Sequence, residues 1–264
     1  MGDDNLNNHT IQKYADMLYE AERDRVPVPP LTEQYPALTV SDAYTIQLEN
    51  INRVTAMGQV ISGKKIGLTS PGIQQQLGVN EPDYGHLFAS MNCADGLVDT
   101  NQLIQPKIEA ELAFVLASNL SGGKVTVQDV LAATEYVVGA FEIVDSRVAE
   151  WKIRLADTVA DNASSGRYIL GEKRYRASDT DLSAETMNLY KNGTLAGQGS
   201  GSAVLGNPCA AVAWLANRLW DFGIPLKGGE VILSGAFSAA PTAQKGDVFK
   251  VEFSSFGSIE ARFI

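Results

Sequence analysis

The pattern of hydrophobic and polar residues divides the chain into two parts. In residues 10–25, apolar side chains recur at the spacing of one helical face, and charged residues occupy the opposite face. A proline-rich loop follows, after which Thr39 or Ser41 is placed to cap a second helix. We therefore predict a helical N-terminal region over 1–57 and a catalytic, β-rich domain over 58–264.

Beyond residue 57, short apolar runs bounded by Gly, Pro, Asn and Asp predict mainly β-strands. Two helices are expected to interrupt them, one capped by Thr126 and one that begins at Asn207 with a proline in its first turn. The tail from Glu230 should form strands with turns at Gly246 and Gly257. This order predicts a mixed α/β fold built on a large curled sheet. A Rossmann fold is not expected, because no G-x-G-x-x-G motif or P-loop is present.

Two glutamates interrupt an otherwise apolar segment, residues 108–116. The length and apolar character of this segment fit a strand. Side chains alternate between the two faces of a strand, so Glu109 and Glu111 should point the same way, about 6.5–7 Å apart. Both faces of the segment are largely apolar, and we therefore expect the two carboxylates near the end of a buried strand.

A third glutamate, Glu142, lies within the apolar run 137–144. Burying an unpaired carboxylate is costly, so a buried cluster needs protons, basic partners or a cation. A hard cation with oxygen ligands, Mg²⁺ or Mn²⁺, fits such a cluster. The alternative is that the glutamates lie at sheet edges and pair with basic residues such as Lys107 and Arg147. The pattern alone leaves both interpretations open.

Composition restricts the kind of metal site. The chain has two histidines, His9 and His86, and two cysteines, Cys93 and Cys209, outside any C-x-x-C motif. A histidine-rich or cysteine-based metal site is therefore excluded, and a metal must be bound through oxygen. The net charge of −10 argues against non-specific binding to nucleic acid or to an anionic membrane.

Apolar runs are short throughout the chain. None approaches the ~18–20 residues that cross a bilayer, and the polar N-terminus has no signal-peptide core. We expect a cytoplasmic protein that acts on a small molecule and binds neither nucleic acid nor membrane.

Six segments stand in order along nearly the whole chain: Gly63–Ser70, Glu81–Gly85, Pro106–Glu111, Glu142–Arg147, Asp161–Ser165 and Gly257–Phe263. Together they resemble the hydratase/decarboxylase branch of the fumarylacetoacetate hydrolase superfamily. The hydrolases of that superfamily carry a Gly-Thr-Pro turn where this chain has Ser234-Gly235-Ala236-Phe237. This departure argues against C–C bond hydrolysis.

The resemblance implies a fold and a metal site. The implied fold is a central rolled β-structure of the fumarylacetoacetate hydrolase C-terminal type with flanking helices. Glu109, Glu111 and Glu142 match the residues that bind one Mg²⁺ or Mn²⁺. Lys65, and not its neighbour Lys64, matches the active-site lysine.

The resemblance also implies a reaction. The expected reaction is the metal-dependent addition of water to 2-hydroxypenta-2,4-dienoate, which gives 4-hydroxy-2-oxopentanoate in aromatic meta-cleavage catabolism. Lys65 and Asp83 are the candidate catalytic residues, because the reaction needs proton transfers. Pro82-Asp83 also fits a plain turn. Ser164 is a candidate ligand of the substrate carboxylate, and it fits a helix cap equally well.

Two other functions stay open from the sequence. One is decarboxylation of 4-oxalocrotonate (2-oxo-3-hexenedioate), although an acidic Asp83 would repel a second carboxylate and so favours hydration. The other is a non-catalytic partner subunit. The resemblance further implies a homo-oligomer, with a decamer as one form, and raises an association with a pathway decarboxylase.

Overall fold

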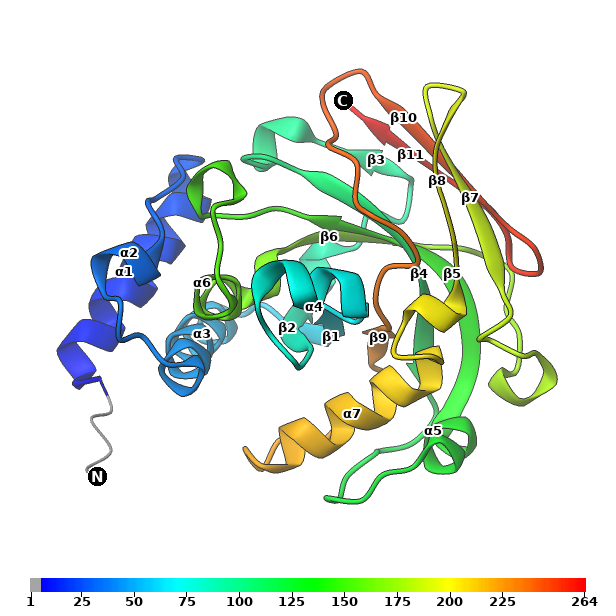
Figure 1. Cartoon of the computed structure of the whole chain (residues 1–264), viewed down its shortest axis with the longest axis horizontal. Coiled ribbons are helices and arrows are strands. Elements are labelled where there is room, and N and C mark those ends of the chain that lie inside the picture. Colours follow the sequence, from blue (N-terminus) through cyan, green and yellow to red (C-terminus); the bar gives the residue numbers. More distant parts are fainter. Residues whose placement is uncertain (1–5) are drawn as a thin grey trace.

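The computed structural model describes the backbone of residues 6–264 and all of their side chains except those of residues 73, 76 and 77. Its strands form two sheets, and the helices α1, α2, α3 and α6 gather on the side away from the smaller sheet (Figure 1). The helices are α1 (Asn8–Asp24), α2 (Leu31–Gln34), α3 (Val40–Ala56), α4 (Pro71–Leu77), α5 (Val127–Ala133), α6 (Leu155–Ala160) and α7 (Pro208–Trp220).

The larger sheet has six strands in the order β2-β1-β9-β4-β5-β6. Its strands are β1 (Ile61–Gly67), β2 (Asp83–Phe88), β4 (Lys107–Leu116), β5 (Thr134–Val144), β6 (Ser165–Leu170) and β9 (Val231–Leu233). Only β1 and β9 run parallel to each other; every other neighbouring pair in this sheet is antiparallel.

The smaller sheet has five strands in the order β3-β11-β10-β7-β8. Its strands are β3 (Leu97–Val98), β7 (Thr186–Lys191), β8 (Thr194–Ser200), β10 (Val248–Phe253) and β11 (Gly257–Phe263). This sheet packs over β5 near Gly139. A Cβ atom at that position would lie 2.7 Å from the Phe253 ring, so the close approach requires glycine.

The long strands β4 and β5 are apolar on both faces, as the sequence predicted. Ile108 and Phe114 of β4 belong to the main hydrophobic core, whereas Ala113 and Val115 on its other face pack with Val138 in a second cluster. A polar side chain on a strand that is covered on both faces has no access to solvent. Glu111 and Glu142, which are fully buried in these two strands, therefore need partners inside the protein.

The N-terminal helices pack against α6, and α3 also contacts β2 of the larger sheet directly. The α3 helix contacts α6, and the carboxylate of Asp157 in α6 accepts hydrogen bonds from the amide and hydroxyl of Thr32 in α2. Ile46 of α3 and Phe141 of β5 belong to the same core. The expected boundary after residue 57 coincides with the end of α3 and stays a prediction.

Predicted helix ends are confirmed where side-chain caps mark them. Thr39, Thr126 and Asn207 each accept a hydrogen bond at the start of α3, α5 and α7. The prediction of a continuous loop before residue 39 is wrong, because α2 lies in it. The helices α4 and α6 are also not predicted by the sequence, since helices of four to seven residues show no repeated hydrophobic period. Among residues 6–264, no helix has both the length and the hydropathy of a membrane span.

Candidate active site

Three glutamates meet where β4 lies against β5. Glu109 stands directly opposite Glu142 in the strand pairing, and Glu111 follows on the same face of β4. Each offers a carboxylate oxygen within 4.8 Å of an oxygen from the other two. Glu111 and Glu142 are fully buried, and Glu109 is half-buried. The strand alternation that the sequence analysis used is confirmed.

The cluster carries more negative charge than its neighbours neutralise. The Lys65 ammonium forms an ion pair with Glu142 at 3.1 Å, and Glu111 Oε2 accepts a hydrogen bond of 2.8 Å from the amide of Gly235. Glu111 Oε1 and Glu142 Oε2 are buried without a hydrogen-bond partner. Such oxygens, gathered in one place, fit a hard divalent cation.

Burial and the charges of the neighbouring glutamates both raise the pKa values within this cluster. Burial, together with the charges of Glu142 and Glu109, holds the pKa of Glu111 well above its ordinary value. Burial raises the pKa of Glu142 to about 7, although Lys65 opposes the rise. Both shifts mean that the folded protein disfavours the fully ionised cluster unless a positive charge joins it.

Lys65 and Asp83 come from the neighbouring strands β1 and β2, and both are nearly inaccessible to solvent. Burial lowers the pKa of Lys65, but the negative charges of Glu142, Asp83, Glu109 and Glu111 outweigh it and raise the pKa above its ordinary value. The lysine therefore stays protonated.

Asp83 is poised differently. Burial raises the pKa of its carboxyl group, and the charge of Lys65 only partly offsets this. Oδ2 accepts a hydrogen bond of 3.3 Å from the Thr158 hydroxyl, and Oδ1 has no hydrogen-bond partner. A Cβ atom at Gly67 would lie 2.2 Å from Oδ1, so glycine at this position gives the carboxylate its room. The alternative that Asp83 is a plain turn residue does not fit, because it lies within β2.

Lys65, Asp83 and one glutamate of the cluster, Glu109, line a cavity of about 600 Å³. Its wall contains Lys65, Asp83 and Glu109, which are charged, together with apolar side chains such as Trp151 and Phe237. A small 2-oxo acid would fit, with one polar end at the carboxylates and an apolar end against the wall.

Ser164 also lines this cavity, but its hydroxyl donates a hydrogen bond of 3.3 Å to Asp161 Oδ2. It lies in the short 3₁₀ turn η4 (Asn162–Ser164), which follows α6. The Asn162 amide group brackets the backbone of His86, accepting from its N–H and donating to its carbonyl. The segment is therefore a turn fixed against β2 rather than a helix cap.

The two basic residues considered from the sequence, Lys107 and Arg147, form no ion pair with the three glutamates. Arg147 pairs with Asp161, whose carboxylate lies behind the cavity wall. The Lys107 ammonium lies 4.2 Å from the centre of the Trp151 ring and forms no ion pair with a carboxylate of the described residues. Lys65, which the analysis had singled out for catalysis, is the cation next to the cluster.

Two further residues of the site had no clear signal in the sequence. Thr158 reaches Asp83 from α6, a helix that was not predicted. Gly235 has φ +116°, and a Cβ atom there would lie 2.4 Å from the Thr69 hydroxyl oxygen, so this backbone can donate to Glu111 only because the residue is glycine. The Gly235 segment had been noted only as a departure from the hydrolases.

The fumarylacetoacetate (FAA) hydrolase C-terminal family model matches residues 90–264, which contain all three glutamates. The chain belongs to the fumarylacetoacetate hydrolase family. Within this family, it is 47% identical over 256 residues to a 2-hydroxyhexa-2,4-dienoate hydratase of Comamonas testosteroni, covering 96% of this chain and 97% of the relative. It is 45% identical over 253 residues to a 2-keto-4-pentenoate hydratase of Paraburkholderia xenovorans, covering 96% and 94%.

A solved structure of this family shares the whole fold. The 4-oxalocrotonate decarboxylase from Pseudomonas putida G7, complexed with magnesium and adipate, matches with a TM-score of 0.95 and 38% identity, covering 98% of this chain and 99% of that one. The expected mixed α/β fold of the fumarylacetoacetate hydrolase type is confirmed.

Proposed function

We propose that this member of the family is a divalent-metal-dependent hydratase that converts 2-hydroxypenta-2,4-dienoate and water to 4-hydroxy-2-oxopentanoate in aromatic meta-cleavage catabolism. One observation carries the proposal: three clustered carboxylates, a lysine paired with one of them and a buried aspartate line or adjoin one small cavity. The identity of 45% to a 2-keto-4-pentenoate hydratase over nearly the full chain supports the same reaction.

Glu109, Glu111 and Glu142 are the residues that would hold the cation, Mg²⁺ or Mn²⁺. When bound, such an ion polarises the oxygen at C2 of a 2-oxo acid and stabilises the negative charge that develops there. The unpartnered oxygens of Glu111 and Glu142 support this assignment. Lys65 balances part of the remaining charge, because its ammonium lies beside Glu142.

The reaction adds a proton at C5, a hydroxyl group at C4 and a proton at C3, and the enol hydroxyl at C2 loses its proton as it becomes the ketone. We assign the proton transfers to Asp83 and Lys65. The raised pKa of Asp83 brings its carboxyl group closer to the operating pH, where proton exchange with water and carbon is most effective. The raised pKa keeps Lys65 charged, so its ammonium serves first as a hydrogen-bond donor and is only a weak acid.

Ser164 is a weaker candidate than Lys65 and Asp83. Its position in the cavity wall allows contact with the substrate carboxylate, but its hydroxyl proton already points to Asp161. We propose that Ser164 contributes to the shape of the binding site and donates a hydrogen bond to the substrate carboxylate only if its contact to Asp161 is exchanged.

Decarboxylation of 4-oxalocrotonate is the second candidate, because the decarboxylase structure shares the whole fold. A decarboxylase must hold a second carboxylate, and two features bear on this. Buried Asp83 would repel it, whereas Lys107 in the same cavity would attract it. The names and identities of the hydratase relatives favour hydration.

A substrate panel distinguishes the two activities. Purified protein is assayed with 2-hydroxypenta-2,4-dienoate and with 2-oxo-3-hexenedioate, each with and without Mg²⁺. We expect Mg²⁺-dependent consumption of the dienoate with formation of 4-hydroxy-2-oxopentanoate, and little CO₂ from the dicarboxylate. Rapid CO₂ release without hydration would reassign the protein as a decarboxylase. Turnover of neither substrate would favour the non-catalytic partner subunit.

The same proposal includes a cytoplasmic homo-oligomer, with a decamer as the form to test, and an association with a pathway decarboxylase. Light scattering of the purified protein measures the first. Co-purification with the decarboxylase measures the second.

A further inference from the structure

A strained turn forms part of the active-site wall. Asn162, Ala163 and Ser164 have φ values of 52°, 49° and 53°, so three consecutive residues other than glycine are left-handed. This conformation is unfavourable for residues with a Cβ atom and persists only where the surroundings enforce it. Ala163 and Ser164 both face the cavity that contains Lys65 and Asp83.

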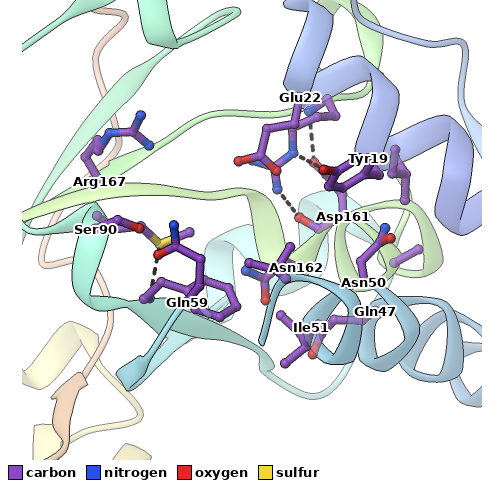
Figure 2. Close-up of a pocket in the computed structure, with 16 residues that line it drawn as sticks. Tyr19, Glu22, Gln47, Asn50, Ile51, Gln59, Ser90, Asp161, Asn162 and Arg167 are labelled. Carbon is purple, nitrogen blue, oxygen red and sulfur yellow. Dashed lines mark hydrogen bonds and ion pairs between the residues drawn. The ribbon is translucent and has the colours of Figure 1, made fainter. Parts of the chain in front are cut away.

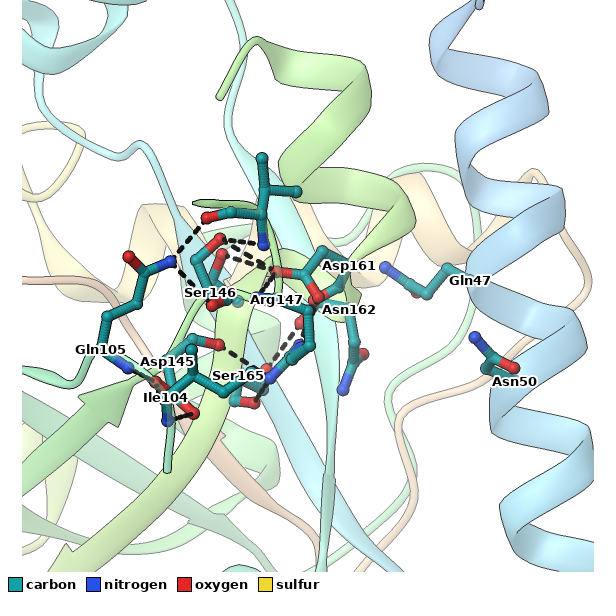
Figure 3. Close-up of polar contacts among 12 residues, drawn as sticks. Gln47, Asn50, Ile104, Gln105, Asp145, Ser146, Arg147, Asp161, Asn162 and Ser165 are labelled. Carbon is teal, nitrogen blue, oxygen red and sulfur yellow. Dashed lines mark hydrogen bonds and ion pairs between the residues drawn. The ribbon is translucent and has the colours of Figure 1, made fainter. Parts of the chain in front are cut away.

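Arg147 holds this turn from behind. Its guanidinium group donates to the Oδ1 and carbonyl oxygen of Asp161, the residue immediately before the turn, and to the carbonyl oxygen of Ser165, immediately after it, at 2.8 Å (Figure 3). It also donates to the carbonyl oxygen of Asp145 at 2.8 Å, just beyond the end of β5. One buried side chain thus ties both ends of the turn to β5.

The turn is also fixed relative to Asp83. The Asn162 side chain accepts a hydrogen bond of 2.7 Å from the backbone N–H of His86 and donates one of 2.9 Å to its carbonyl oxygen. A Cβ atom at Gly85 would lie 2.3 Å from the carbonyl oxygen of Asn162, so the turn rests directly on β2. A shift of the turn would therefore change the space between Ser164 and Asp83.

We propose that Arg147 is a positioning residue for the reaction in this cavity. It does not line the cavity and forms no ion pair with the three clustered glutamates among residues 6–264. It acts through the 162–164 turn, because it fixes the position of the cavity wall that Ala163 and Ser164 form beside the substrate. The kinetic test of this inference rests on the proposed hydration, whereas the hydrogen-exchange test does not.

A second cavity, of about 220 Å³, makes the proposal testable by chemical complementation. Asp161 and Asn162 line one side of it, and Gln47 and Asn50 of α3 line another (Figure 2). Arg147 also belongs to its lining. The carbonyl oxygens of the Gln47 and Asn50 side chains have no hydrogen-bond partner. Removing the Arg147 side chain would extend this cavity to the Asp161 carboxylate, where a guanidinium ion from solution can bind.

The matched control is Arg167, which lines the same second cavity. Its guanidinium group donates to the carbonyl oxygen of Gly166, its own neighbour in the chain, and not to the turn. Arg147→Ala and Arg167→Ala therefore remove the same group from the same cavity, but only the first removes the support of the turn.

The experiment measures kcat and KM for the dienoate, Mg²⁺ affinity by calorimetry and thermal unfolding. For Arg147→Ala we expect kcat/KM to fall about 100-fold, the size of effect that a displaced site can have, with the Kd for Mg²⁺ changed less than about twofold. Millimolar guanidinium should raise the kcat/KM of Arg147→Ala by at least about tenfold. Arg167→Ala should keep wild-type activity and show no activation.

Each contrary result overturns the proposal. A parallel loss of Mg²⁺ affinity and activity, or a loss of activity that guanidinium does not reverse in a folded protein, would make Arg147 a merely structural residue. If Arg147→Ala does not fold, Arg147→Lys and Asp161→Asn carry the same kinetic test. Both variants should lower kcat/KM without weakening Mg²⁺ binding. Unchanged kinetics in both would contradict the inference.

Hydrogen exchange separates this inference from the proposed function. Arg147→Ala should exchange faster over residues 161–166 while residues 107–116 stay protected, and guanidinium should slow the exchange again. This result is expected even if the wild type does not hydrate the dienoate. Unchanged exchange over 161–166 would refute the positioning role whatever the substrate is.

Discussion

The ammonium of Lys65 lies 3.1 Å from Oε1 of Glu142, and both side chains are buried. This pair joins the two halves of the site, because β1 and β2 supply Lys65 and Asp83 while β4 and β5 supply the glutamates. One ammonium cannot balance three carboxylates. Burial and the repulsion among the carboxylates raise the pKa values of Glu111 and Glu142, and a divalent cation would offset both effects.

Replacing a glutamate of the cluster should separate metal binding from folding. Glu111→Gln should abolish hydration and weaken Mg²⁺ binding by at least about 100-fold, because a charged ligand is lost while the amide can still accept from Gly235. The metal-free variant should unfold at a higher temperature than the metal-free wild type, since one buried like charge is gone. Calorimetry and thermal unfolding test both statements, and an unchanged Mg²⁺ affinity would remove Glu111 from the site.

The two adjacent lysines should behave in opposite ways. Lys65→Ala should lower kcat by about 10²–10⁴-fold, the usual range for a lost acid or base. Lys64 is also buried, but it pairs with Glu230 at 2.7 Å, on the other side of the strand. Lys64→Ala should therefore leave kcat within a few-fold and destabilise the protein by about 3–5 kcal/mol, because Glu230 loses its partner.

Denaturation and steady-state kinetics of both lysine variants give the comparison. A similar loss of kcat in the two, with no difference in stability, would mean that the strand matters only for its packing.

Asp83→Ile should test the proton-transfer role. Hydration of the dienoate should fall by about 10²-fold or more, because the only carboxylate that β2 supplies to the cavity is replaced by an apolar group. Binding of oxalate to the Mg²⁺-loaded protein should change much less, since oxalate needs only the metal. If oxalate affinity falls as far as the hydration rate, Asp83 supports the binding site rather than the chemistry.

Some of these residues could be recognised from the sequence, and others could not. Alternation along one strand brings Glu109 and Glu111 to one face, and this follows from the local pattern alone. The partners of Lys107 and Arg147 depend on contacts between distant segments, with Trp151 and Asp161 respectively, and no local period encodes them. The α6 helix, which supplies Thr158, is six residues long and too short for a helical period.

Titration of the glutamate cluster should make the metal-free protein more stable in mildly acidic solution than in basic solution. The folded pKa of Glu142, about 7, exceeds its unfolded value, so the folded state binds more protons between about pH 4.5 and 7. Stability from this group therefore rises as the pH falls through 7. Comparing the thermal unfolding of wild type and Glu142→Gln between pH 6 and 8 isolates the effect, which the variant should lack.

The most direct test of the account is a Mg²⁺ titration of metal-stripped protein, with disappearance of 2-hydroxypenta-2,4-dienoate as the readout and Glu142→Gln measured alongside. The account predicts no hydration without metal, saturable recovery in the wild type and no recovery in the variant at the same Mg²⁺ concentrations. Full hydration by the metal-stripped wild type, or equal recovery in Glu142→Gln, would contradict it.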